Sequence, residues 1–575
     1  MKTVNKNLLG ILFCVLGLMV NANNLTITNV SLTGATSTTI QVQYNLFWDN
    51  SWRDLENWDA AWVFVKYSTN AGLNWSHATL STTGHVIGTS TPGATIHIPQ
   101  DNTGAFIYRS SVSSGTFTIT GQQLQWNFTA NGLNQTQASG ATIRVFGMEM
   151  VYIPQGEYYL GDGVNYSTTP TPTASAFTRS GTNNSAGFIP SNISETLNDP
   201  FYGDFRINGL LGVDLNNDTV VSTWPTDAPS FPTGYKAFYT MKYKVTQGQY
   251  TDFLNTLTYD QQSQRVNNAH NTANASIWDG STTALPSHRN NIFVLTPGIS
   301  NTQPRIYTAT RPDRECNYIN WPDAAAYLDW AALRPYSEFE KEKFARGPVP
   351  PVQGEIANGT TSFSALVGIT SGVENGTEIA TNTTQNLYNI SQEYYPTGGD
   401  NSSFYRAPIR SGIFGTSSST RVQSGSTYYG VNDYGSGLIE WQVSFATLAG
   451  RSFTGLHGNG VLNTIAQADV NFWPGINGNS TTSTANSTYA GTTGVNTGAG
   501  ITFTGFMNYN AGIYTAAWGP WLGTSYHNNS YPYFISARMN PSYLNVSTIS
   551  TSTGRQTSYT TRYQTMGFRG VKSNL

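Results

Sequence analysis

The sequence predicts an α+β fold in which a β-sandwich of immunoglobulin or fibronectin type, residues 23–147, precedes a loop-rich region with two or three helices. The first part holds about eight short runs of alternating apolar and polar residues, separated by Gly, Ser and Thr turns. Near Met148 this alternation stops, and only beyond it do apolar residues recur at helical intervals. Long stretches rich in Ser, Thr, Asn and Gly separate the later elements, which indicates many loops.

Composition narrows the class of protein. The chain has 575 residues, of which only 11% are charged, and its formal net charge is −3. No basic run stands out, so we expect no nucleic-acid surface, which needs clustered Lys and Arg. Aromatic residues make up 13% of the chain, enough to fill large cores, so the chain is not of the disordered class.

The first 22 residues have the pattern of a secretory signal peptide. Lys2 and Lys6 precede an apolar run, residues 8–20, and Ala22 closes a small-residue cleavage signature. The run is too short to span a membrane as a helix. We therefore expect a secreted protein, extracellular or periplasmic, that is cleaved near Ala22 and does not span a membrane.

Cysteine usage limits both disulfides and metal sites. The chain has 2 Cys, and Cys14 lies within the expected signal peptide. Cys316 alone remains after cleavage, so no intramolecular disulfide and no site built from several thiolates is expected. We interpret Cys316 as a small packed apolar residue.

The strands of residues 23–147 are read from their period of two. Runs such as LTITNVSLTG, TIQVQYNLFWD and ATIRVFGMEMVYIP alternate in this way. Four tryptophans lie in the same part, and they either fill the core or form an exposed aromatic face; we expect the core: Trp48, Trp52, Trp58 and Trp62.

Three helices are predicted beyond residue 235, after a Ser/Thr/Asn-rich insertion at about 162–235. The first is TQGQYTDFLNTLT with Thr246 as its N-cap, and the second is NWPDAAAYLDWAAL. The third, SEFEKEKFARG, has Ser337 as N-cap, Glu340 three residues later and Gly347 as its end.

Five motifs resemble, in order, those of the formylglycine-generating enzyme family, also called sulfatase-modifying factors. They are MVYIPQGEYYLGD, FYTMKYKVTQGQYTDFLNTL, NYINWPDAAAYLDWAALRPYSEFEKEKFARGP, YGVNDYGSGLIEW and GFRGVK. The resemblance covers about residues 148–575 and implies a loop-rich variant of the C-type lectin fold.

The family's activity depends on a pair of thiols near the C-terminal end that bind copper(I) and activate oxygen to oxidise a substrate cysteine. Soft thiolates are the ligands that copper(I) selects. In this chain the corresponding stretch, NNSYPYFISARMNP, contains no Cys. We therefore expect neither copper binding nor formylglycine formation, and we assign no catalytic residue.

The resemblance also implies structural calcium. The matching positions are Asp433, the carbonyls of Ser436 and Leu438, and Glu440, which offer the hard oxygen ligands that calcium prefers. The alternative is that Asp433 caps a turn and Glu440 pairs with a nearby Arg. A second family site corresponds to three residues, Asn389, Ile390 and Asp400.

These observations favour an extracellular protein that binds a ligand or a surface, a glycan or a protein. The aromatic loop AAWGPWLGTSYHNNSYPYF either stacks on such a ligand or fills the core. The candidate ligand-binding residues are Trp518, Trp521, Tyr526, Tyr531, Tyr533, Arg538 and His457. One alternative is an oxidoreductase of the same superfamily with non-cysteine ligands, and another is a structural component of an extracellular assembly.

Overall fold

The computed structural model describes residues 25–160, 230–267, 289–352, 408–416, 419–434, 438–443, 453–474 and 566–573, shorter pieces between them, and the backbone of several isolated strands. Strands and loops dominate, and the helices are few and short, so the predicted α+β, loop-rich class is confirmed. The immunoglobulin or fibronectin form of the N-terminal part stays a prediction.

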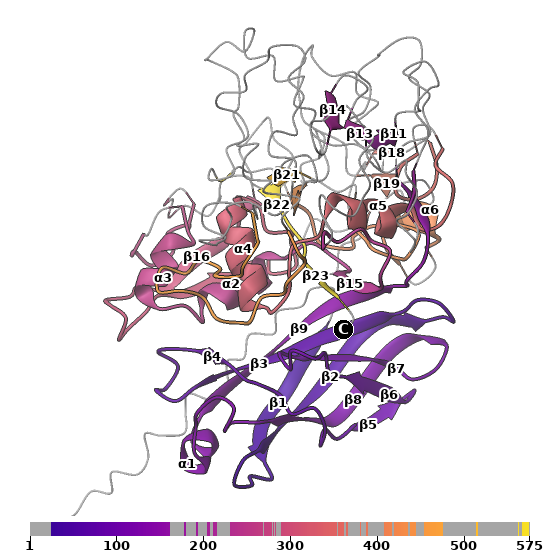
Figure 1. Ribbon diagram of the computed structural model, residues 1–575. Coiled ribbons are helices and arrows are strands. Elements are labelled where there is room, and N and C mark those ends of the chain that lie inside the picture. The colour runs from indigo at the N-terminus through magenta and orange to yellow at the C-terminus, as the bar shows by residue number, and fades with distance from the viewer. Residues whose placement is uncertain are drawn as a thin grey trace, which may run out of the picture.

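The N-terminal β unit, residues 25–153, contains two antiparallel sheets (Figure 1). The first sheet has the order β1-β2-β8-β5, with β1 Thr26–Thr33, β2 Ile40–Arg53, β8 Ser113–Trp126 and β5 Thr89–Thr91. The second has the order β23-β15-β9-β3-β7-β6, and β4 pairs with β3 beside it. Its strands are β3 Asp59–Ser68, β4 Ser76–His77, β6 Ala94–His97, β7 Ala105–Arg109, β9 Thr142–Ile153, β15 Phe238–Met241 and β23 Val571–Ser573.

The second sheet continues from the N-terminal β unit into the later part of the chain. β9 pairs along its whole length with β3, from Thr142 opposite Ser68 to Val151 opposite Asp59. On its other edge, the end of β9 pairs with β15, and β15 pairs with β23. Met148, where the character of the sequence changes, therefore lies inside a strand and not in a linker.

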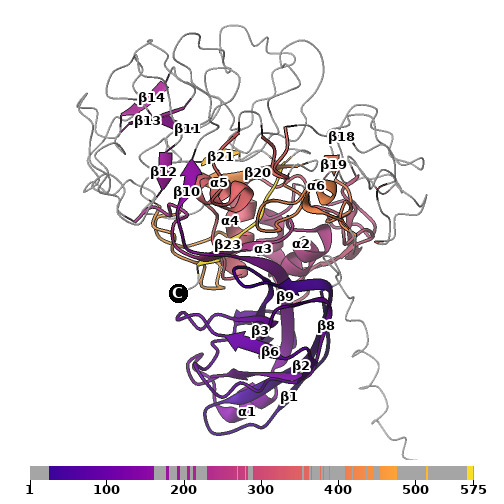
Figure 2. The same cartoon turned by 90° about the vertical axis from the view of Figure 1, so that its right-hand side faces the viewer.

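Strand β3 is buried on both faces, which explains why its sequence DAAWVFVKYS is almost continuously apolar. Ala61, Val63 and Val65 belong to an apolar cluster shared with the first sheet. Trp62 and Phe64 point the other way, into the larger cluster formed with the helices. Figure 2 shows the helices of residues 247–346 on the far side of this sheet from β1 and β2.

The four tryptophans of the N-terminal β unit do not share one environment. Trp48 and Trp62 are fully buried in different clusters, as expected of core residues. Trp52 and Trp58 are half-buried, and Trp58 stacks on Tyr152 with 4.0 Å between ring centroids.

Each helix among the described residues begins with a capping box, in which the N-cap side chain and the third residue of the helix exchange hydrogen bonds. The three predicted helices are confirmed, with the expected caps Thr246 and Ser337 and an end at Gly347. Three further short helices were not predicted. The helices are α1 Gln135–Ser139, α2 Gln247–Leu254, α3 Tyr259–Gln264, α4 Trp321–Trp330, α5 Glu338–Arg346 and α6 Arg421–Ser424.

The later part of the chain, from residue 230 on, is here called the helix-bearing unit. Its helices α2 and α4 pack on the second sheet, and Trp62 donates its indole N–H to Ala331 O over 3.0 Å. The remaining strands of the helix-bearing unit include the hairpin β16 Ile292–Thr296 and β17 Ile306–Ala309, and the pair β18 Ser364–Ala365 and β19 Leu387–Tyr388. A small sheet is formed by β20 Ile439–Val443, β21 Ile513–Thr515 and β22 Met566–Gly567. Within the expected insertion lie β11 Phe177–Arg179, β12 Ser191–Ile193, β13 Asp204–Ile207 and β14 Leu211–Asp214, and β12 pairs with β10 Tyr158–Leu160.

Candidate functional site

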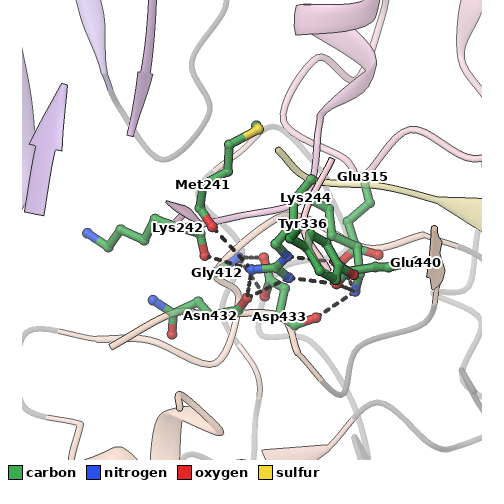
Figure 3. A network of polar contacts seen from close by, with 10 residues as sticks. Met241, Lys242, Lys244, Glu315, Tyr336, Gly412, Asn432, Asp433 and Glu440 are labelled. Carbon is green, nitrogen blue, oxygen red and sulfur yellow. Dashed lines mark hydrogen bonds and ion pairs between the residues drawn. The ribbon is translucent and has the colours of Figure 1, made fainter. Parts of the chain in front are cut away.

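A buried network of charged residues occupies the centre of the helix-bearing unit (Figure 3). At its core, Arg569 forms a two-point ion pair with Glu440: Nε lies 2.8 Å from Oε2, and Nη2 lies 2.8 Å from Oε1. The Tyr336 hydroxyl donates to Glu440 Oε2 over 3.0 Å. Such paired, charge-assisted hydrogen bonds fix position and orientation together.

Arg569 also holds backbone from two other segments. Its guanidinium donates to the carbonyl of Asn432 over 3.0 Å and to those of Met241 and Lys242 over 3.3 and 3.4 Å. Burial alone would raise the pKa of Glu440, but the charges of Arg569 and Lys244 outweigh it and hold this pKa below its usual range. The pair therefore stays ionised and joins β20 to the end of β15 and to the loop around residue 432.

Lys244 is the second cation of the network, and its side chain has no exposed surface. Its Nζ lies 2.5 Å from the carbonyl oxygen of Asp433, 3.1 Å from Glu315 Oε1 and 3.7 Å from Glu440 Oε1. One main-chain oxygen and two carboxylates thus converge on this ammonium (Figure 3).

Asp433 contributes its main chain and its side chain separately. Its φ of 59° is a left-handed conformation, in which the carbonyl faces Lys244. Its carboxylate accepts the Gly412 N–H, at 3.1 Å from Oδ1 and 2.9 Å from Oδ2. Burial and the neighbouring charge of Glu315 raise the pKa of Asp433 to about 7.

A second buried lysine, Lys242, links the network to the N-terminal β unit. Figure 3 shows its side chain leaving in a different direction from that of Lys244. Its Nζ lies 3.0 Å from Glu149 Oε2 on β9 and 3.4 Å from Asp59 Oδ2 on β3. Trp48 donates to the same Asp59 oxygen over 3.1 Å. Burial alone would lower the pKa of Lys242, but the charge of Glu149 outweighs it and holds this pKa well above its usual range.

Two further lysines cross the contact between the units. Lys572 on β23 lies 2.6 Å from Asp101 Oδ2 and donates to Thr103 Oγ1 over 3.0 Å and to Ala332 O over 2.8 Å. Lys66 on β3 donates to Gly460 O over 2.6 Å. Burial lowers the pKa of Lys66 well below its usual range and that of Lys572 to about 8.

Two histidines at this contact are held neutral. His77 is buried, and its Nε2 lies 2.5 Å from Thr103 O. His457 is half-buried and accepts the Ser573 N–H at Nε2 over 2.8 Å, which anchors β23. Burial lowers the pKa of both rings well below the usual value, followed by the charge of Lys66 for His77 and by the charge of Lys572 for His457.

One protein-family model matches part of this chain. A family model described as "Sulfatase-modifying factor enzyme 1-like domain" matches residues 208–488. The chain carries a sulfatase-modifying-factor-like domain. The matched range lies inside the 148–575 span over which the motifs resemble the family, and it includes Lys244, Glu315 and Glu440. No curated protein matches the chain.

Cys316 of the sulfatase-modifying-factor-like domain is fully buried among apolar residues, next to the start of α4. Burial, with the nearby charge of Asp323, raises the pKa of its thiol well above the usual range. A reactive or metal-binding cysteine needs the opposite, a stabilised and accessible thiolate.

The side chains of Asp433 and Glu440, expected as calcium ligands, already have partners within the protein. Both carboxylate oxygens of Glu440 accept from Arg569, the Asp433 carbonyl accepts from Lys244, and the Asp433 carboxylate accepts from Gly412. Two fixed cations already lie among these donors, so the described residues do not fit a calcium ion at this place. Leu438 is buried, and Ser436 lies outside the described residues.

Most of the other expected site residues lie outside the part of the chain that the structure describes. Asn389, Ile390 and Asp400 of the second calcium site lie outside the described residues. So do most of the ligand-binding candidates: Trp518, Trp521, Tyr526, Tyr531, Tyr533 and Arg538. Across the described parts of the chain, no three His, Cys, Asp or Glu side chains gather as metal ligands, and no helix is long and apolar enough to cross a membrane.

Sequence reasoning missed the residues that organise the network: Lys244, Glu315, Tyr336 and Arg569. A usable signal was present in MKYKVT, where Lys242 and Lys244 stand among apolar residues of a chain with only 11% charged residues. Charged side chains in such a segment are almost never fully buried unless paired. The partners come from segments 71 to 328 positions away, which no local pattern reveals.

Proposed function

We propose that this protein is an extracellular binding protein whose sulfatase-modifying-factor-like domain no longer generates formylglycine. The observation that carries the proposal is the state of its thiols. The sequence has 2 Cys, one of them inside the expected signal peptide, and the other, Cys316, is packed in the core with a raised pKa. Two accessible thiolates are what copper(I) chemistry on this domain requires.

The rest of the central site supports a scaffold rather than a catalyst. Lys244, Glu315, Glu440 and Arg569 neutralise one another, and all are buried. A general acid or base must come within hydrogen-bond reach of a substrate. These charges instead hold together segments of the domain, as a rigid support for binding loops does.

The binding surface that we propose is the aromatic loop containing Trp518 and Trp521. Aromatic rings present large area at low entropic cost and stack on sugar rings or on protein side chains. The ligand class is an uncharged glycan or a protein surface, since the chain carries few charges with which to recognise ions. Secretion through residues 1–22 would bring the protein to such ligands.

Two assays test the proposal. The purified protein is incubated with a cysteine-containing sulfatase peptide, copper(I) and oxygen, and mass spectrometry is expected to find the peptide unchanged; an aldehyde product overturns the loss of activity. Glycan-array and extracellular-matrix binding is then compared between the parent and a Trp518→Ala/Trp521→Ala variant. Trp75→Ala is the matched control, because Trp75 lies in the N-terminal β unit under the Arg144 guanidinium. Equal binding by all three proteins contradicts the proposed surface.

A further inference from the structure

Asp433 and Glu440, two residues expected as calcium ligands, both contact the buried ammonium of Lys244. In the family that the sequence resembles, a calcium ion is expected here, yet the expected ligand Glu440 is already paired with Arg569 and Lys244, and the carbonyl of Asp433 accepts from Lys244. Lys244 supplies the ammonium that the loop oxygens surround, and it comes from the segment between β15 and α2.

The oxygen set around Lys244 is of the kind that binds a hard cation. The Asp433 carbonyl at 2.5 Å, Glu315 Oε1 at 3.1 Å and Glu440 Oε1 at 3.7 Å are one main-chain oxygen and two carboxylate oxygens. Calcium sites combine these same ligand types, and an ammonium group donates hydrogen bonds to such oxygens.

Local backbone geometry is fitted to this contact. Asp433 adopts a left-handed φ of 59°, an uncommon conformation for a residue with a side chain, and the Gly412 N–H bonds to its carboxylate. Lys244 is aligned in turn by its neighbours, because the Val245 N–H donates to Phe568 O over 3.0 Å and the Cys316 N–H donates to Val245 O over 2.8 Å. The Asp433 carbonyl and the backbone that carries Lys244 are therefore fixed by main-chain geometry, while Glu440 is held by the side chains of Arg569 and Tyr336.

Lys244 and Arg569 offset the charges of the two glutamates without a metal ion, and the pKa of Asp433, raised to about 7, leaves that carboxyl only partly ionised at neutral pH. Lys244 and Arg569 bring two positive charges, and Glu315 and Glu440 bring two negative ones, all on buried side chains. A divalent cation added here would lie close to the positive charges of Lys244 and Arg569. Because this interior is poorly solvated, the like charges would repel one another strongly. Without Lys244, the three remaining groups, Arg569, Glu315 and Glu440, would carry one uncompensated negative charge.

We infer that the Lys244 ammonium is the resident cation of this loop and stabilises it as a bound metal ion would, so that the loop requires no calcium. The substitution Lys244→Ala removes three methylene groups and the nitrogen, and the void that it leaves matches n-propylammonium in length and charge. The variant site is therefore a binding site for a primary alkylammonium ion.

The first test uses the native protein, cleaved of its leader. Its thermal midpoint is measured in calcium chloride and in chelator at equal ionic strength. We expect the same midpoint in both, and a midpoint that rises with calcium and falls with chelator overturns the inference, because a ligand of the native state alone must raise it.

The second test uses Lys244→Ala, with the exposed Lys236→Ala as the matched control. We expect the first variant to melt roughly 5 °C or more below the parent and the control to melt with the parent. A parent-like midpoint for Lys244→Ala contradicts the inference.

The third test is chemical rescue of the same variant. It is denatured and refolded by dilution into n-propylammonium chloride or into tetramethylammonium chloride, which has the same charge and no N–H donor. Greater recovery of near-UV circular dichroism in n-propylammonium supports the inference. Equal recovery, including none in either salt, overturns it.

Discussion

The Lys572 ammonium lies 2.6 Å from Asp101 Oδ2, although 471 positions separate the two residues in the chain. Asp101 belongs to the N-terminal β unit and Lys572 to β23, which is hydrogen-bonded to β15. The two units therefore meet through side chains as well as through the sheet that both share.

The lowered pKa of Lys572, about 8, predicts a rise of stability in alkali. Between pH 8 and the ordinary lysine pKa of about 10.5 the unfolded chain binds the proton that the folded chain has released, so the free energy of unfolding increases with pH. We expect at most about 1.4 kcal/mol per pH unit from this group between pH 8 and 10. Urea unfolding should show a flatter profile for Lys572→Met and a parent-like profile for the exposed Lys236→Met; parallel profiles for all three would refute this.

The lowered pKa of His77 predicts a loss of stability in acid. Its folded-state pKa lies well below 6.5, so the unfolded chain takes up the proton first, and stability falls as the pH drops below 6.5. His77→Gln keeps a donor for Thr103 O without a titrating ring. The difference in unfolding free energy between parent and variant should change by up to about 1.4 kcal/mol per unit from pH 6.5 to 5. A constant difference over this range counts against the prediction.

Breaking the central ion pair should be costly. Glu440→Gln leaves Arg569 and Lys244 buried with one carboxylate fewer, and we expect a loss of about 3–5 kcal/mol in the free energy of unfolding. Glu56→Gln, at an exposed glutamate, is the control and should change stability by less than about 0.5 kcal/mol. Equal effects of the two changes would show that the pair contributes nothing.

The shared sheet predicts one cooperative unfolding transition for both units. Separation would expose Trp62 and Phe64 on β3 and remove the partner of β9 along β15. Unfolding in urea, followed by far-UV circular dichroism and by tryptophan fluorescence, should give coincident curves. Two resolved transitions, or a fragment of residues 23–147 as stable as the parent, would contradict it.

Cys316 should behave as a packed apolar residue. Its thiol should react with a disulfide reagent at the rate of unfolding, because it has no exposed surface in the folded protein. Cys316→Ser, which buries a hydroxyl, should cost about 1–3 kcal/mol more than Cys316→Ala. Fast labelling in native buffer would show that the thiol is accessible.

The sequence predicted the elements whose cause is local. Thr246 with Gln249 and Ser337 with Glu340 form the caps of α2 and α5 within four residues, and both helices begin where expected. The pairing of β9 with β15 was not predicted, because 85 or more positions separate the strands and both faces of the sheet are buried. The alternative given for the calcium ligands, Glu440 paired with an Arg, corresponds to the observed contact with Arg569.

The capping boxes have a consequence for the order of folding. Each is closed by residues three positions apart, so the helix starts are available to a chain that has formed no distant contact. The Glu440–Arg569 and Asp101–Lys572 contacts instead close loops of 129 and 471 positions, whose entropy must be lost before any contact compensates for it. We expect helix formation to be fast and the closure of the second sheet to limit the folding rate, with intermediates in which the helices are formed and β23 is not yet paired.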